Sequence, residues 1–196
     1  MSKSITANRA IKAKPKASMS RIQANIERTQ AIVDQVIVAN KFLHLAETDE
    51  LDISDLPDEQ VSVPLNLWLE NKSAIKSRSG KVAVQVSADE NPADLLDDLD
   101  QIDVIVLPFV NHVDGRGYTH AQLLRSRYGF KGEIRAIGDV KFDQLRFLTR
   151  VGCNAFELAE GENLKTALRA FTELQEVYQP ATDGARLVYS RRRAIH

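Results

Sequence analysis

From about residue 60 onward, short apolar runs alternate with longer segments in which apolar residues recur at every third or fourth position. Runs of the first kind are typical of β-strands, and segments of the second kind are typical of amphipathic helices. Strands are predicted at 61–63, 82–86, 104–107, 133–137 and 155–158. Helices are predicted from Pro64 to Gly80, Asn91 to Leu99, Thr119 to Gly129, Asp139 to Gly152 and Leu164 to Tyr178.

Polar residues and prolines indicate where several of these helices begin. Pro64 suits the first turn of a helix, because the N–H that proline lacks has no partner there. Asn91 before Pro92 is typical of an N-cap, and Asp139 is predicted to cap the helix that follows it. Thr119 and Gln122 have the spacing of a capping box.

The alternation of strands and helices predicts the α/β class, with a mainly parallel sheet of four to six strands flanked by helices. A closed barrel of this type needs eight strands. The spacing therefore leaves two arrangements open, a small open sheet and a partial TIM-like arc.

The first 60 residues are patterned differently. Ile22, Ile26 and Val33 indicate a weak helix, and two short extended runs around Ala39-Asn40-Lys41 suggest a small hairpin. Residues 47–59 are strongly acidic and are predicted to form a loop. The expected organisation is a basic, irregular N-terminal extension at 1–34, partly disordered or helical, a single α/β domain at 35–180 and a polar, basic tail at 181–196.

Composition and charge argue against several classes of protein: disulfide-linked, zinc-binding through cysteine, membrane-spanning and nucleic-acid-binding. The chain has 196 residues and one cysteine, so neither an internal disulfide nor a cysteine-based zinc site is expected. No apolar run approaches the roughly 20 residues of a membrane span, and we expect a cytoplasmic protein without membrane contact. Residues 1–30 hold seven basic side chains and one acid, but no aromatic residue is interleaved with them, so nucleic-acid binding is not expected.

The loop at 109–118 contains the strongest candidate site, because ligands of parallel sheets bind beyond the carboxyl ends of the strands. Its central residues are Asp114, Gly115, Arg116, Gly117 and Tyr118. Two glycines let backbone amides approach a ligand closely, and a guanidinium can bind an anionic group bidentately. The alternative is a tight turn in which the aspartate caps and the arginine pairs with a surface acid.

Four further residues are candidates for ligand binding: Arg125, Asp139, Asp143 and Gln144. For Asp139, helix capping is the simpler interpretation. No metal site is predicted, because the histidines share no ligand spacing. The loop is neither a dinucleotide fingerprint nor a P-loop, so no cofactor is implied, and Cys153 is interpreted as a small buried hydrophobic residue.

Residues 103–157 contain five distinctive segments in a specific order: Val113-Asp114-Gly115-Arg116-Gly117-Tyr118, Leu123-Leu124-Arg125-Ser126-Arg127-Tyr128-Gly129-Phe130, Gly132-Glu133-Ile134-Arg135-Ala136-Ile137-Gly138-Asp139-Val140, Asp143-Gln144-Leu145 and Arg150-Val151-Gly152-Cys153-Asn154-Ala155-Phe156. In this order and spacing they resemble a bacterial family known as domain of unknown function 934. Tyr178-Gln179 matches further on, and weaker similarity reaches back to about Val36. The basic N-terminal arm and Asn111-His112 depart from the family pattern.

The resemblance implies a pathway rather than a reaction. Members of this family are typically encoded beside the sirohaem-containing sulfite reductase subunit and are loosely labelled oxidoreductases. We therefore expect an accessory protein of assimilatory sulfite reduction, with the sulfite reductase hemoprotein subunit as its partner. The alternative is a small enzyme or sensor that binds a sulfate- or phosphate-bearing metabolite at the Asp-Gly-Arg-Gly loop. The sequence contains no redox-cofactor motif, so whether the chain is an enzyme stays open.

Overall fold

The computed structural model describes residues 30–45, 56, 60–78, 80–111, 113–173 and 176–192. Most of the basic arm and of the acidic segment at 47–59 lies outside these residues, as do His112 and Arg193. The predictions made for those segments therefore stay predictions. No helix among the described residues has the length and apolar character needed to cross a membrane.

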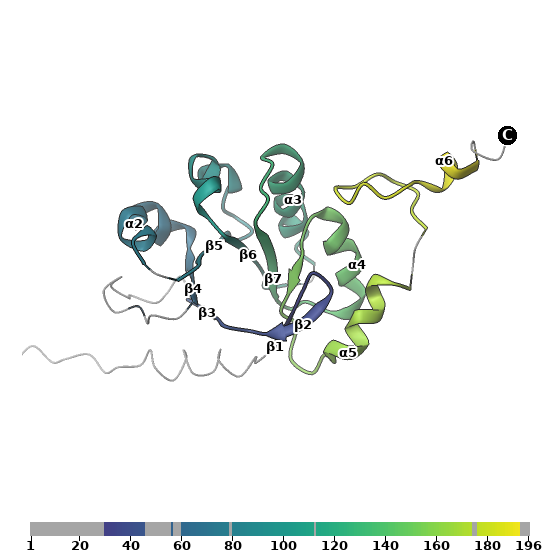
Figure 1. Ribbon diagram of the computed structural model, residues 1–196, viewed down its shortest axis with the longest axis horizontal. Coiled ribbons are helices and arrows are strands. Elements are labelled where there is room, and N and C mark those ends of the chain that lie inside the picture. The colour runs from purple at the N-terminus through teal and green to yellow at the C-terminus, as the bar shows by residue number, and fades with distance from the viewer. Residues whose placement is uncertain are drawn as a thin grey trace, which may run out of the picture.

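Eight strands form one sheet with helices packed against it (Figure 1). The strands are β1 (Gln30–Val33), β2 (Val36–Ala39), β3 (Phe42–His44), β4 (Gln60–Pro64), β5 (Val82–Gln85), β6 (Val104–Phe109), β7 (Glu133–Gly138) and β8 (Ala155–Phe156). Their order across the sheet is β2-β1-β8-β7-β6-β5-β4-β3. Strands β3 to β8 pair in parallel, whereas β1 pairs antiparallel with both β8 and β2.

The predicted sheet was too small and too uniformly parallel, because the β1–β2 hairpin was missed. Gln30–Val33, which we expected to end a weak helix, is a strand. The hairpin turn is made by Asp34 and Gln35, with φ of 47° and 65°. Positive φ at both central residues is the geometry of a type I′ turn, which usually contains Asn-Gly or Asp-Gly. The hairpin predicted around Asn40 is also wrong, because β2 and β3 lie at opposite ends of the strand order.

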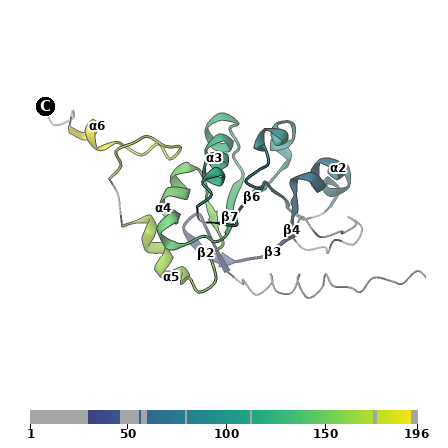
Figure 2. The ribbon, with the colours of Figure 1, turned by 180° about the vertical axis from the view of Figure 1, so that it is seen from behind.

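The sheet is curled, so its first and last strands approach each other (Figure 2). β2 ends at Ala39 and β3 begins at Phe42, so only two residues connect the two ends of the strand order. Three Cα steps span at most about 11 Å. Side chains also cross the interior of the curl, where His44 Nε2 lies 2.9 Å from Glu157 Oε1. Of the two predicted arrangements, the structure therefore has the arc.

Helical segments cover the outer face of the curl (Figure 1). They are α2 (Leu65–Lys76), the 3₁₀ helix η2 (Pro92–Gln101), α3 (Arg116–Gln122), the π-helical turn η3 (Leu123–Arg127), α4 (Phe142–Val151), α5 (Leu164–Ala167) and the 3₁₀ turn η4 (Leu168–Phe171). A last short helix, α6 (Val188–Arg192), lies away from the sheet (Figure 1). The helix predicted from Leu164 to Tyr178 ends at Phe171. Beyond it, residues 176–192 run along the end of α4 and away from the sheet.

The predicted helix starts have mixed outcomes. Asn91 caps η2 as expected, since its side chain accepts a 3.0 Å hydrogen bond from Ala93 N. The capping box at Thr119 is wrong, because α3 already begins at Arg116 and Thr119 lies inside it. Asp139 is not the cap of α4 either. The N-cap is Lys141, whose backbone N–H donates to Gln144 Oε1 at 2.9 Å.

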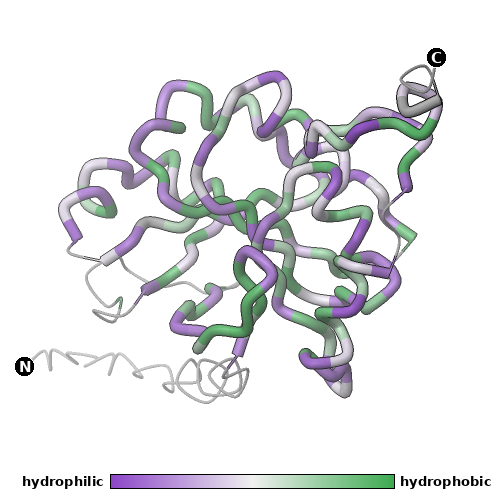
Figure 3. Tube along the Cα trace, turned by 45° about the vertical axis from the view of Figure 1, so that its right-hand side comes forward, coloured by the Kyte–Doolittle hydropathy of each residue, from purple (hydrophilic) through white to green (hydrophobic). Residues whose placement is uncertain are grey.

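Alternate residues along each strand face opposite sides of the sheet, and the two sides differ in chemistry. The outer side contributes Val84, Ile105 and Ile134 to a large core shared with the helices, in which Trp68 is fully buried. The inner side holds a smaller apolar cluster of Phe42, Ala83, Val104 and Val106. Figure 3 shows hydrophobic positions concentrated along the strands in the centre of the molecule. The inner side also carries polar residues, which are described with the site.

Candidate functional site

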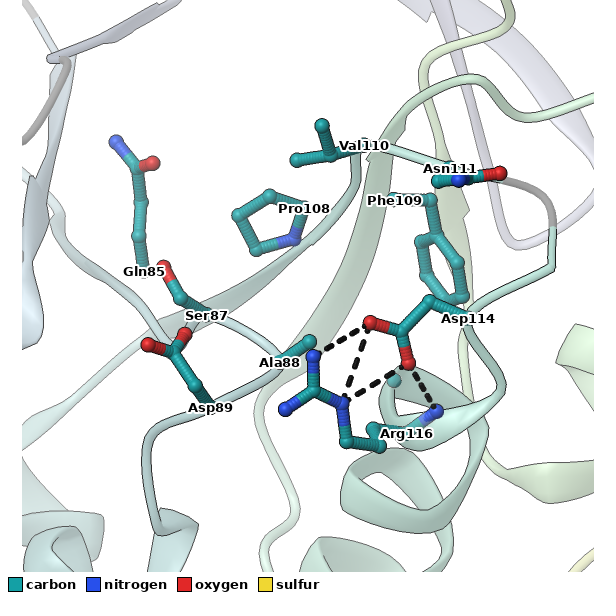
Figure 4. A pocket seen from close by; sticks show the side chains of 11 residues that line it. Gln85, Ser87, Ala88, Asp89, Pro108, Phe109, Val110, Asn111, Asp114 and Arg116 are labelled. Carbon is teal, nitrogen blue, oxygen red and sulfur yellow. Dashed lines mark hydrogen bonds and ion pairs between the residues drawn. The ribbon is translucent and has the colours of Figure 1, made fainter.

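A pocket of about 490 Å³ opens at the carboxyl ends of β5 and β6 (Figure 4). This is the edge of the sheet at which the sequence places the candidate loop. The lining residues are Gln85, Ser87, Ala88, Asp89, Pro108, Phe109, Val110, Asn111, Asp114, Arg116 and Gly117. Three of the five central loop residues therefore lie in its wall, and the volume is in the range typical of small-molecule sites.

Asp114 and Arg116 form a bidentate ion pair at the pocket wall. Arg116 Nη2 donates to Asp114 Oδ2 at 2.7 Å, and Nε donates to Oδ1 at 3.0 Å. The backbone N–H of Arg116 also donates to Asp114 Oδ1, at 3.1 Å. These hydrogen bonds lower the pKa of Asp114 to about 2. The arginine thus pairs with an acid of its own loop, while 58% of its side chain stays exposed.

The two glycines of the loop have different roles. A Cβ on Gly115 would meet nothing within 4 Å, so backbone at this position is open to a ligand. A Cβ on Gly117 would lie 2.8 Å from Cζ of Phe109. Gly117 therefore lets α3 pack directly on β6, which is a structural requirement rather than a ligand contact.

Tyr118 faces away from the pocket, toward α4. Its ring centroid lies 5.2 Å from that of Phe109 and 5.3 Å from that of Phe147. Burial raises the pKa of Tyr118, as does the charge of Asp143, and a hydrogen bond with Gln144 acts in the opposite direction. The structure therefore brings Tyr118, Asp143 and Gln144 together between two helices, outside the pocket.

Asp139 and Arg125 also lie outside the pocket. The backbone N–H of Asp139 donates to Phe109 O at 2.7 Å, which joins the ends of β6 and β7. Arg125 Nη1 donates to Phe130 O and Gly132 O, at 2.8 and 2.7 Å. Its Nε donates to Gly152 O at 2.8 Å. These carbonyls precede β7 and β8, so Arg125 holds together the opposite end of the sheet.

A buried polar network on the inner side of the curl was not predicted. Glu157 Oε1 accepts hydrogen bonds from His44 Nε2 at 2.9 Å and from Arg135 Nη1 at 2.8 Å. His44 Nδ1 lies 2.6 Å from Ser62 Oγ. Gln85 Nε2 donates to the same hydroxyl at 3.0 Å, so the network reaches the pocket wall. The sequence signal for it is the alternation Glu133-Ile134-Arg135-Ala136, which places charges on one face of a buried strand.

The serine, imidazole and carboxylate in this network are connected like a catalytic triad. Burial by itself raises the pKa of Glu157, but hydrogen bonds and charges from His44 and Arg135 outweigh it and lower the pKa. Ser62 is 0% exposed, so its hydroxyl cannot reach a substrate. Glu157 is also paired with the guanidinium of Arg135, as expected for a buried structural carboxylate. The network therefore closes the curl rather than supplying a nucleophile.

Two further titratable residues, His120 and Cys153, are buried outside the pocket lining. His120 is buried on α3, and its Nδ1 has no hydrogen-bond partner among the described residues. Burial lowers the pKa of His120. The thiol of Cys153 is fully buried, which raises its pKa to about 12, as expected for an inert core cysteine. Within the described residues, no group of three or more His, Cys, Asp or Glu side chains is arranged to hold a metal ion.

These features define an α/β protein with a curled, mixed eight-stranded sheet and a pocket at the carboxyl ends of two parallel strands. The family model described as bacterial protein of unknown function (DUF934) matches residues 83–189, which is more than half of the chain. The chain belongs to this family, as the sequence resemblance predicted. The match includes the pocket loop and most of the parallel sheet. A comparison with curated proteins found no match.

Proposed function

We propose that this protein binds a small ligand in the pocket at the carboxyl ends of β5 and β6, with an anionic group of the ligand at Arg116. The observation that carries the proposal is the placement of a guanidinium in the wall of a pocket of about 490 Å³. Nε and Nη2 of that guanidinium donate hydrogen bonds to Asp114. Among the described residues, Nη1 makes no hydrogen bond, and it is the atom that we assign to the ligand.

The bidentate pair supports binding because it fixes the guanidinium before a ligand arrives. An arginine held by two parallel hydrogen bonds loses little conformational freedom when a third partner binds. The pocket also has apolar wall from Pro108 and Val110. Sites of this kind combine apolar walls with a few oriented polar groups.

Calorimetry with sulfate and phosphate as probes, at low ionic strength, tests this proposal. Arg116→Ala is expected to weaken binding of both probes by about tenfold or more, the effect of losing one charged hydrogen bond. Arg127→Ala is the matched control, because Arg127 is an exposed arginine outside the pocket. Equal affinities of the wild type and the Arg116 variant would refute the assignment of the site.

A second proposal concerns the cellular role. We infer that the protein assists the sirohaem sulfite reductase in assimilatory sulfate reduction, in the cytoplasm. Membership in the DUF934 family supports this role, through the gene neighbourhood that the resemblance implies. The proposal assigns no reaction to the chain, and the pocket then serves as a binding site within the pathway.

Growth of a deletion strain tests the role in the pathway. The strain is expected to grow on sulfide but poorly on sulfate or sulfite, and the wild-type gene should restore growth. Complementation with Arg116→Ala and with Arg127→Ala then shows whether the pocket matters for the pathway. Normal sulfite reduction in the deletion strain, together with failure to co-elute with sulfite reductase at low salt, would exclude the role.

A further inference from the structure

The wall of the pocket across from Arg116 presents hydrogen-bond acceptors. Asp89 is an exposed carboxylate there, and it forms no ion pair with any residue that the structure describes. Figure 4 shows it on the far side of the guanidinium from Asp114. Asp89 and Asp114 together carry two negative charges and Arg116 carries one positive charge, so the charged lining sums to −1. A ligand that is only an anion would make the net charge of the site still more negative, −2 for a monoanion.

The side-chain amide of Gln85 is oriented by the buried network. Its Nε2 donates to Leu45 O at 2.7 Å and to Ser62 O and Oγ, both at 3.0 Å. The reversed amide would place an oxygen against two carbonyl oxygens, which have no proton to donate. The amide nitrogen of Gln85 therefore faces the buried network and not the pocket. Figure 4 shows the amide oxygen on the side of Pro108, within the pocket lining, where it is an acceptor for a donor of the ligand.

We infer that the ligand is a small zwitterion, with its anionic group at Arg116 and an ammonium group facing Asp89 and the amide oxygen of Gln85. This inference rests on the proposed function and specifies the class of ligand. An ammonium group supplies three donors for the two acceptors, and its positive charge cancels that of the ligand's own anionic group, so binding adds no net negative charge to the lining. Pro108, Val110 and Ala88 provide apolar wall for a short carbon chain between the two groups. Amino acids and aminosulfonates have this chemistry.

Two matched pairs of probes test the inference. Taurine and ethanesulfonate share a sulfonate and differ by one ammonium group, and β-alanine and propionate differ in the same way with a carboxylate. Calorimetry on the full chain is expected to give about tenfold or greater tighter binding for the ammonium-bearing member of each pair. Equal or tighter binding of ethanesulfonate and propionate would overturn the inference, and so would failure of all four probes to bind.

The variant Asp89→Asn tests whether the ammonium group of the ligand binds at Asp89. Because Asp89 is exposed, this variant is expected to fold normally and to lose most of the preference for the ammonium group, while its affinity for ethanesulfonate stays the same or rises. Asp97→Asn, at an exposed aspartate of η2, is the control and should keep the full preference. A preference that survives Asp89→Asn would refute the placement of the ammonium group.

These measurements separate the inference from the function on which it rests. If sulfate and ethanesulfonate bind in an Arg116-dependent manner and the ammonium group adds nothing, the pocket assignment stands and the zwitterion inference is wrong. If sulfate, phosphate and all four probes fail to bind, both are wrong.

Discussion

His44 and Glu157 are 113 positions apart in the chain, yet His44 Nε2 lies 2.9 Å from Glu157 Oε1. The histidine ends β3, the last strand in the order across the sheet, and the glutamate follows β8. Their hydrogen bond therefore crosses the interior of the curl. Arg135 joins the same carboxylate oxygen and also donates to Asn40 Oδ1 at 2.9 Å. Side chains thus hold the curl together at the point where the described strands form no backbone ladder.

Glu157→Gln is expected to destabilise the protein by about 1–3 kcal/mol, the usual cost of losing charged hydrogen bonds at a buried group. The amide removes one of the two carboxylates that pair with Arg135, whose Nε keeps its 2.6 Å contact with Glu133, and it weakens the bond to His44. Urea unfolding at pH 7 measures the change. Glu160→Gln, at an exposed position, is the control and should shift stability by less than about 0.5 kcal/mol.

The same carboxylate gives a pH dependence of definite sign. The pKa of Glu157 is lowered in the folded state from its ordinary value of 4.5, so its ionised form stabilises the fold above that pH. This contribution is lost as the pH falls through the lowered folded pKa. Urea unfolding between pH 7 and pH 3 should show a steeper loss of stability in the wild type than in Glu157→Gln. Parallel profiles for the two proteins would contradict this assignment.

Gly117→Ala is expected to destabilise the protein by about 1–2 kcal/mol, although alanine favours helices. The new Cβ would lie 2.8 Å from Cζ of Phe109, and the cost of overpacking exceeds the gain in helix propensity. Gly115→Ala is the matched control, because its Cβ meets nothing and its φ is −83°. Thermal unfolding compares the two. The double variant Gly117→Ala, Phe109→Leu should cost less than the sum of the single changes if the contact is the cause.

Arg125→Ala is expected to lower stability by about 2–4 kcal/mol, since three backbone carbonyls and the side chain of Asn154 lose a charged donor. Arg125→Lys should recover little, because one ammonium group cannot reproduce the planar arrangement of donors. Chemical denaturation measures both variants. Arg116→Ala, at an exposed residue, should leave the melting temperature almost unchanged. A large loss in that variant would show that Arg116 is required for folding.

The pKa of Asp114 reports directly on the Asp114–Arg116 pair. Hydrogen bonds from Arg116 lower that pKa to about 2, and Arg116→Ala should return it toward the ordinary value of 3.8. An NMR titration of the side-chain carboxyl carbon between pH 1.5 and 6 follows the change. An unchanged pKa in the variant would show that the pair does not persist in solution.

Cys153 should resist alkylation in the native protein. Its thiol is fully buried and its pKa is raised to about 12, so almost no thiolate is present at pH 8. Mass spectrometry after iodoacetamide treatment is expected to find no modified protein in buffer and complete modification in strong denaturant. Rapid labelling of the native chain would indicate that the interior between α4 and β8 opens readily.

The strands and helices of the parallel half were predictable because each is specified locally. β6 is a continuous apolar run that is buried on both faces, and α4 has one apolar face that ends at Gly152. The last helix was overestimated for a related reason. Val177 occupies the expected apolar position and is buried, but it packs from a segment that is not helical. Periodicity therefore identified the buried residue without the backbone conformation that buries it.

The curl and the site depend on relations between distant residues, which a single sequence does not display. Asp34 and Gln35 make a turn that ordinarily uses glycine, so nothing local marked the β1–β2 hairpin. Without that hairpin, the strand order could not be predicted. The pocket loop was predictable from its position after β6, whereas Gln85 and Asp89 come from the neighbouring strand and its loop, and their role depends on strand pairing.

Asn40 and Lys41 link the two ends of the strand order, and this junction is a seam that differs from the other strand boundaries. Across every other strand boundary, separation breaks a ladder of backbone hydrogen bonds. At this seam, the contacts that the described residues show are made by side chains such as that of Glu157, and the two-residue tether limits how far the edges can part. The interior can thus widen by a bounded amount while all seven strand pairings stay intact. Because Gln85 belongs to the same network, any such widening would also shift the Gln85 side chain in the pocket wall.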